Sequence, residues 1–158
     1  MADRVLVAGI GNIFLGDDGF GSEVARRLRF EEEPRVRVVD YGIRGMHLAY
    51  DLLAGWDALV LIDALPDRGS QGQVEVLRAE PDEAGAPGLD AHAMHPTAVF
   101  AAVQALGGRV PPTVVVGCQV VSAAERIGLS DPVAAAVDPA VRAVYRVVAD
   151  LLRTKQEV

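Results

Sequence analysis

Residues 9–21, GIGNIFLGDDGFG, are the part of the chain that decides the fold. They follow the apolar run VLVA at residues 5–8 and lead into a segment of helical spacing, so we expect a strand over 4–8, a glycine-rich loop and a helix. Loops of this kind often bind phosphate. Asp17 and Asp18 would place two negative charges in that loop, which favours metal or carboxylate chemistry over phosphate binding.

The glycine spacing also argues against a dinucleotide site. After Gly9 and Gly11, the third glycine of the G-x-G-x-x-G pattern would fall on position 14, which is Phe14. Gly9 and Gly11 therefore have two other interpretations. They could form a tight turn with unusual dihedral angles, or they could let the backbone of another chain approach this edge of the fold.

The composition predicts one globular domain over residues 1–158. The chain is 51% hydrophobic with a net charge of -7, and Arg26, Arg27 and Arg29 are followed at once by the acidic residues 31–33. Nucleic-acid binding, which needs clustered cations, is therefore not expected.

Cys118 is the single cysteine, so no internal disulfide is possible, and we expect a buried, inert thiol. Without a secretory signal or an apolar span, the sequence predicts a cytoplasmic protein that makes no membrane contact.

Buried aliphatic runs alternate with helical patterns along the rest of the chain. This alternation predicts a three-layer α/β/α sandwich around a mostly parallel sheet of about five strands. The alternating residues 73–77 predict an exposed antiparallel edge strand, and the long loop at 79–91 is a functional candidate. Further strands are expected at 36–41, 58–62 and from 113 onward. Helices are expected around Phe20, Val24 and Leu28, over 46–53, from Pro96 until Gly107 ends it, and from a cap at Asp138 with Pro139 in the first turn.

Polar residues follow the strands where such a sheet binds its ligands, beyond the carboxyl ends. Asp18 follows the first strand and Asp63 comes directly after the apolar run 58–62. His92 and His95 lie before the helix that starts at Pro96. Carboxylate oxygen and imidazole nitrogen together suit zinc or nickel, and three protein ligands would leave a position open for water or substrate.

Each of these residues also has a simpler interpretation. Asp17 is better explained as the cap of the first helix, and Asp18 could be a solvated acid in its first turn. Asp40 could accept hydrogen bonds from loop amides near Gly42. Asp63 is harder to explain in this way, because a buried carboxylate without a partner is unfavourable. Either candidate histidine could be solvent-exposed, and His47 is expected at the surface or as a satisfied core residue.

The chain resembles the hydrogenase maturation endopeptidases, which trim the C-terminal tail of a nickel-iron hydrogenase large subunit. The resemblance extends from about Val5 to about Leu151. The motifs that carry it are Gly9-Ile10-Gly11-Asn12 with Asp17-Asp18-Gly19-Phe20-Gly21, Asp40 followed by Gly42 and Gly45, Ile62-Asp63-Ala64, His92, and Gly128-Leu129-Ser130.

This resemblance implies that Asp18, Asp63 and His92 are the metal-contacting and catalytic residues. It implies hydrolysis of one peptide bond after a nickel-holding cysteine motif, with the nickel presented by the large-subunit precursor, or with zinc or another divalent ion in its place. Ile43 stands where many relatives carry threonine, and the neighbouring Arg44 could meet a substrate carboxylate. We expect the residues that contact substrate to be Gly11, Asn12, Asp40, Arg44 and His95.

Two other functions fit the same residues. A metal-dependent amidase or a spore-type protease of this layered fold would cleave substrates that carry no nickel. A nickel-dependent assembly factor would bind the large subunit without cleaving it. Fold alone does not separate these possibilities. The remaining expectation is that the protein is a monomer.

Overall fold

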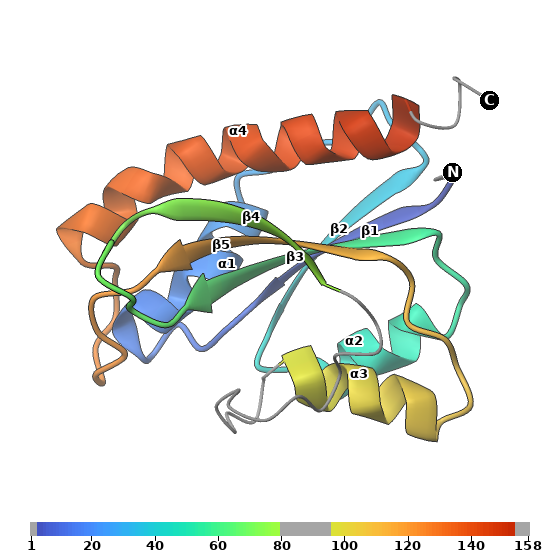
Figure 1. Ribbon diagram of the computed structural model, residues 1–158, viewed down its shortest axis with the longest axis horizontal. Coiled ribbons are helices and arrows are strands. Elements are labelled where there is room, and N and C mark those ends of the chain that lie inside the picture. Colours follow the sequence, from blue (N-terminus) through green and yellow to red (C-terminus); the bar gives the residue numbers. More distant parts are fainter. Residues whose placement is uncertain (1–2, 80–95, 154–158) are drawn as a thin grey trace.

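A computed structural model describes residues 3–79 and 96–153, and it shows a five-stranded sheet between two layers of helices (Figure 1). The strand order is β2-β1-β3-β5-β4; β4 pairs with β5 in the antiparallel sense and the other pairings are parallel. The sheet contains β1 (Val5–Ile10), β2 (Val36–Gly42), β3 (Ala58–Leu65), β4 (Val74–Ala79) and β5 (Thr113–Gln119). The predicted architecture and the antiparallel edge strand are thus confirmed.

Two hydrophobic cores cover the two faces of the sheet. Alternation along the fully buried β1 turns Val5 and Val7 toward one core and Leu6 and Ala8 toward the other. Helices α1 (Phe20–Ala25) and α4 (Asp131–Arg153) pack on the first face, and α2 (Gly45–Leu52) and α3 (Pro96–Ala105) pack on the second. Among the described residues, no helix is both long and apolar enough to cross a bilayer.

The strand order creates one place where ligands are expected. β1 lies between β2 and β3 in the sheet. The connection from β1 leads to β2 on one side, and the connection that follows β3 leads to the other side, so the two connections run in opposite directions. At such a switch point the loops diverge beyond the carboxyl ends of the strands and leave a crevice. A short 3-10 helix, η1 (Gly16–Gly19), follows β1 at this edge, and the last residues of β3 reach the same edge.

The predicted start of α4 and the predicted end of β3 are wrong. Helix α4 begins at Asp131, not at Asp138, and Pro139 lies inside it. The sequence contains two Asp-Pro pairs, and the earlier one starts the helix because the buried positions Val133 and Val137 already pack against the sheet. Strand β3 continues to Leu65. Asp63 therefore lies inside the strand, where it pairs with Gly117 of β5, and does not follow the strand.

Candidate active site

Gly11 brings the turn that carries Asp18 close to the end of β1. Its φ of 134° is a conformation that side chains disfavour, and a Cβ on Gly11 would collide with the carbonyl oxygen of Asp18. The amide of Asn12 donates to Asp18 Oδ2 at 2.8 Å, and Asn12 Oδ1 accepts from the amide of Phe14 at 2.9 Å. The tight-turn interpretation of Gly11 is therefore correct, and the turn holds the partly buried Asp18 carboxylate at the rim.

Gly9 and Gly21 bring the start of α1 down onto the strands. A Cβ on Gly9 would collide with the carbonyl of Gly21, and a Cβ on Gly21 would collide with the carbonyls of both Ile10 and Ile62. Gly9 thus allows a helix of the same chain to approach, rather than the backbone of another chain. This close packing brings η1, with Asp18, against β3.

Asp63 is a half-buried carboxylate near the end of β3. Burial, together with the negative charge of the nearby Asp18, raises the pKa of Asp63 to about 8, and the amide of Ala64 only partly opposes this by donating to it. The topology therefore brings together two carboxylates that lie far apart in the sequence.

Asp17 does not cap the first helix, contrary to the prediction. Neither η1 nor α1 has a side-chain cap, and the Asp17 side chain is buried at 1% exposure. Its oxygens accept hydrogen bonds from Val121, Ser122 and Ser130, far along the chain. Burial alone would raise the pKa of Asp17, but these hydrogen bonds outweigh it and hold the pKa below its usual range.

Asp40 and Arg44 lie at the neighbouring strand end, that of β2. Asp40 Oδ1 accepts from Ser22 Oγ at 2.6 Å and from the amide of Gly42 at 3.1 Å, which confirms the expected bond to the Gly42 amide. The Arg44 guanidinium donates to the carbonyl oxygens of Asp40 and Tyr41 at 2.7 and 3.1 Å. Arg44 remains solvent-exposed, so it can still meet a ligand at this rim.

The histidines divide into one that the structure describes and two that it does not. His92 and His95 fall in 80–95, outside the described residues, as does nearly all of the candidate loop at 79–91. His47 is exposed on α2, edge-on to Tyr41 and 3.9 Å from Asp51, so the surface interpretation is confirmed. Cys118 is fully buried, and burial raises the pKa of its thiol to about 11, as expected of an inert cysteine.

The Asp18 and Asp63 pair fits a divalent cation in its chemistry. Carboxylate oxygen is a suitable donor for zinc and nickel, and a cation would offset the repulsion and poor solvation that raise the pKa of Asp63. Within residues 3–79 and 96–153, no group of three or more His, Cys, Asp or Glu side chains is placed to hold a metal. The described part of the chain thus contains two of the three residues that the sequence predicts as ligands, Asp18 and Asp63.

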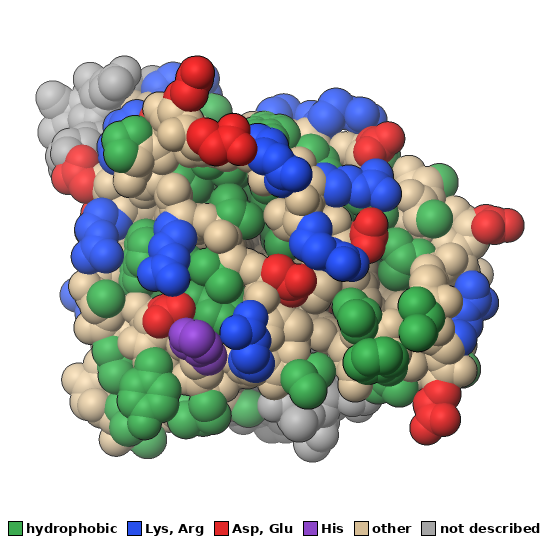
Figure 2. All heavy atoms as spheres, turned by 180° about the vertical axis from the view of Figure 1, so that it is seen from behind, with side chains coloured by type: hydrophobic (Ala, Val, Ile, Leu, Met, Phe, Trp, Pro, Cys, Tyr) green, Lys and Arg blue, Asp and Glu red, His purple; other side chains and the backbone are tan. Residues whose placement is uncertain are grey.

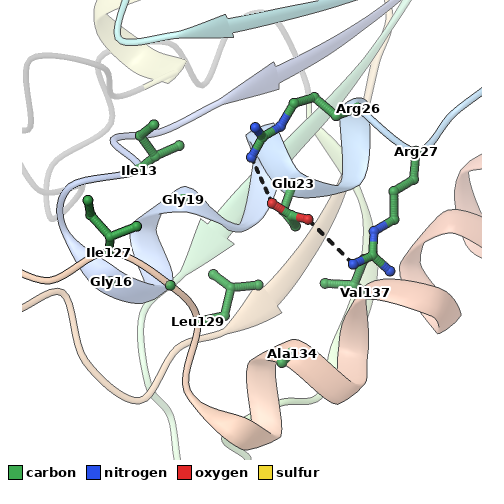
Figure 3. A pocket seen from close by; sticks show the side chains of 11 residues that line it. Ile13, Gly16, Gly19, Glu23, Arg26, Arg27, Ile127, Leu129, Ala134 and Val137 are labelled. Atoms are coloured by element: carbon green, nitrogen blue, oxygen red, sulfur yellow. Dashed lines mark hydrogen bonds and ion pairs between the residues drawn. The ribbon is translucent and has the colours of Figure 1, made fainter.

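A groove of about 380 Å³ is lined in part by residues of η1 (Figure 3). Gly16 and Gly19, from the turn that carries Asp18, line the groove together with Ile13 and Ile127. Arg26 and Arg27 also line the groove, and both guanidiniums bind Glu23, at 2.7 and 3.4 Å.

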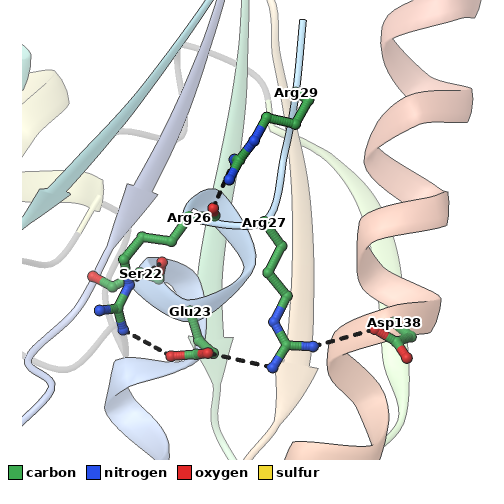
Figure 4. A network of polar contacts seen from close by, with 6 residues as sticks. All are labelled: Ser22, Glu23, Arg26, Arg27, Arg29 and Asp138. Carbon is green, nitrogen blue, oxygen red and sulfur yellow. Dashed lines mark hydrogen bonds and ion pairs between the residues drawn. The ribbon is translucent and has the colours of Figure 1, made fainter.

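The three clustered arginines pair mostly with residues other than the acidic run at 31–33. Arg27 also reaches Asp138 at 3.3 Å, and Arg29 donates to the carbonyl of Arg26 (Figure 4). Of the three, Arg29 lies near the run, 3.9 Å from Glu31. On the face shown in Figure 2, acidic side chains lie between the basic ones. The charge cancellation predicted from sequence is present, but Glu23 and Asp138 provide most of it.

Comparison with known proteins connects this site to one family. Residues 21–147 match the family model HycI, hydrogenase maturation protease. Hydrogenase expression/formation protein HupD of Bradyrhizobium diazoefficiens is 29% identical over 94% of this chain and 79% of its own length. The hydrogenase 2 maturation protease of Escherichia coli is 30% identical over 89% of this chain and 88% of its own. The solved structure of the hydrogenase maturating endopeptidase HybD from E. coli superposes with a TM-score of 0.78 at 28% identity, covering 93% of each chain.

Proposed function

The chain belongs to the hydrogenase maturation protease family, and we propose that it removes the C-terminal extension from the precursor of a nickel-iron hydrogenase large subunit. The reaction is hydrolysis of a peptide bond, as the names of its relatives state for them. The observation that carries the proposal is the meeting of Asp18 and Asp63 at the switch point of the sheet.

Nickel enters this proposal as part of the substrate. The precursor presents the ion, Asp18 and Asp63 bind it through carboxylate oxygens, and His92 adds an imidazole nitrogen. Support comes from the raised pKa of Asp63, since a bound cation stabilises the ionised form of a carboxylate that is poorly solvated. Zinc or another divalent ion could take the same position. Recognition of nickel would limit cleavage to precursors that have already received their metal.

The chemistry then needs a water molecule and a base. A carboxylate of the pair takes a proton from water as the oxygen attacks the scissile carbonyl, and the proton passes to the leaving amine as the C–N bond breaks. The cation beside the carbonyl stabilises the negative charge that develops on its oxygen. Binding through a fixed ion also holds the bond in place, and positioning of this kind lowers barriers substantially.

Residues around the two carboxylates would bind the flanking peptide. The turn at Gly11 and Asn12 approaches the rim from β1, and Asp40 and Arg44 approach it from β2. The exposed Arg44 guanidinium suits a carboxylate of the substrate. We assign His95 to the same peptide-binding role.

The test compares nickel-loaded with nickel-free precursor after incubation with the purified protein. Mass spectrometry should show loss of a C-terminal peptide from the nickel-loaded precursor alone. Equal cleavage of both forms would instead indicate a metal-dependent amidase or a spore-type protease, which does not require nickel in its substrate. Nickel-dependent binding with no change in mass would indicate an assembly factor. Either of these two results would contradict the proposal.

A further inference from the structure

Asp17 is a buried carboxylate whose hydrogen bonds all come from a distant segment. Oδ2 accepts from the amides of Val121 and Ser122, at 2.9 and 3.1 Å, and from Ser130 Oγ at 2.8 Å. Oδ1 accepts from the amide of Ser130 at 2.7 Å. These donors belong to the connection between β5 and α4, more than 100 positions along the chain from Asp17. The proposed reaction makes no use of this carboxylate.

Main-chain hydrogen bonds extend the contact in both directions from Asp17. The amide of Asp17 donates to the carbonyl of Ser122 at 3.0 Å, and the amide of Gly16 donates to that of Arg126 at 2.9 Å. The amide of Arg126 returns a bond to the carbonyl of Phe14 at 3.0 Å. Residues 14–17 are therefore bound along their length to residues 121–130, and Asp17 is the side chain at the centre of this junction.

The next residue is Asp18. Its own amide donates to the carbonyl of Leu15 at 3.1 Å, so the backbone of Asp18 is part of the same turn. Its side chain accepts from the amide of Asn12 at 2.8 Å, and Asn12 makes no contact with Asp17 among the hydrogen bonds above. The direction of the Asp18 carboxylate thus depends on the position of the turn formed by residues 14–18. The hydrogen bonds from the 121–130 segment fix that position.

We propose that Asp17 is a positioning residue, which aims the Asp18 carboxylate at Asp63 by binding the turn to the 121–130 segment. The proposal rests on the proposed function only for the role of Asp18. Asp17 does not touch the substrate or the metal. Each oxygen of Asp17 accepts at least one hydrogen bond. Among the described residues, the Asp18 side chain accepts one hydrogen bond, from the Asn12 amide, and a carboxylate can accept more.

The first test is hydrogen exchange of backbone amides measured by NMR. In Asp17→Asn, the side-chain NH2 must face at least one of the amide donors, so the junction should loosen. We expect Asn12 to exchange at least about tenfold faster, relative to the Val7 amide in the buried β1, which reports global unfolding. Asp67→Asn is the matched control, because Asp67 holds an exposed turn through Gly69 and Gln71.

The exchange rates decide the matter without any assay of activity. If Val121 and Ser122 exchange faster in Asp17→Asn while Asn12 keeps its wild-type rate relative to Val7, the proposal is wrong. Should Asp17→Asn fail to fold, Ser130→Ala removes just the hydroxyl donor and its own amide remains. That variant should speed exchange at Asn12 by about two- to fivefold, and an unchanged rate would overturn the proposal.

The second test is cleavage of nickel-loaded precursor by the folded variant. A misplaced carboxylate should lower kcat by about 100-fold and leave KM close to the wild-type value. A role limited to folding would leave kcat per folded molecule unchanged, and that result would contradict positioning. If the wild-type protein cleaves nothing, the proposed function fails, and the exchange measurement still decides the role of Asp17.

Discussion

Two aspartates at the same edge of the sheet have opposite surroundings. Asp17 is fully buried and receives four hydrogen bonds, which hold its pKa below the usual range. Asp63 is half-buried beside another carboxylate, and the amide of Ala64 is the hydrogen-bonding group that stabilises its charge, so its pKa rises to about 8. Within residues 3–79 and 96–153, the fold thus satisfies the Asp17 carboxylate and leaves the Asp63 carboxylate with few groups that stabilise its charge.

This difference separates a carboxylate that shapes the site from one that is available for chemistry. Acidic groups with raised pKa values gather at functional sites, because function requires an arrangement that stability alone would not favour. A cation brought by a partner would supply what Asp63 lacks. Asp17 needs nothing further, and its role is to fix the turn on which Asp18 sits.

Replacing the two site carboxylates should have the largest effect. Asp18→Asn and Asp63→Asn should each reduce cleavage of nickel-loaded precursor by at least about 100-fold, since each removes a charged ligand or base. His92→Ala should do the same. The rate of peptide release measured by mass spectrometry checks this. Asp57→Asn is the control. Asp57 directly precedes the first residue of β3, at the opposite end of the strand from Asp63, and accepts hydrogen bonds from the amides of Asp3 and Arg4.

The circular dichroism of each variant should match that of the wild-type protein. Normal cleavage by all three site variants would show that the site has been placed wrongly. A loss of cleavage in Asp57→Asn as large as in Asp63→Asn would show that the assay responds to replacement of an aspartate outside the site.

Gly11→Ala should lower the free energy of unfolding more than an alanine substitution at a glycine with open space around it. Its Cβ would collide with the Asp18 carbonyl, in addition to the strain of a positive φ, so the free energy of unfolding should fall by about 3 kcal/mol or more. Gly55→Ala is the matched control: Gly55 has a φ of 86° and open space around it. That variant should lose about 1 kcal/mol. Urea denaturation measures both, and equal losses would mean that the close approach at Gly11 is unimportant.

The stability of Asp63→Asn should depend on pH in a way that reveals the raised pKa. Because the folded state holds this proton more tightly than the unfolded state, the carboxyl destabilises the fold increasingly as pH rises from about 4 to about 8. Asp63→Asn should match the wild-type Tm near pH 4 and exceed it near pH 8. Each kcal/mol of difference corresponds to about 2–4 °C.

Calorimetry at several pH values gives this comparison, with Asp67→Asn as the control. The pKa of Asp67 is lowered by the Gly69 amide and Gln71, so its removal should not raise Tm at high pH. A Tm difference for Asp63→Asn that is the same at both pH values would show that Asp63 titrates normally.

Arg44→Gln should have the smallest effect of these changes. If the exposed guanidinium meets a substrate carboxylate, its loss should raise KM by up to about fivefold and leave kcat unchanged, as expected of a solvent-exposed ion pair. Arg37→Gln, on the exposed side of β2, is the control. An equal KM in the two variants would remove Arg44 from the binding surface.

Local sequence patterns predicted most of the fold. The buried runs of β1 and β3, the alternation in β4 and the Gly9, Gly11 and Gly21 spacing each act over a few residues, so their signals are readable without coordinates. The start of α4 was missed because the Asp138-Pro139 pair imitates a helix start, although Pro139 lies within the helix.

The site was only partly predictable. The sequence indicates Asp18 and Asp63 because each comes after a buried apolar run, but their mutual approach depends on the strand order. The role of Asp17 could not be found, since its donors Val121, Ser122 and Ser130 are more than 100 positions away and leave no local pattern. The sequence shows Gly128-Leu129-Ser130 as a motif, but only the structure shows that the Ser130 hydroxyl donates a hydrogen bond to Asp17.

The central claim is that the protein stabilises the charge of Asp17 but not that of Asp63. Its most direct test is a pH titration of the Asp63 carboxyl carbon by NMR in the metal-free protein. A midpoint near 8 is expected, in agreement with burial and the charge of Asp18. A bound divalent ion should move that midpoint well downward. A midpoint near 4 in the metal-free protein would contradict the account, because Asp63 would then be an ordinary solvated carboxylate with no need of a cation.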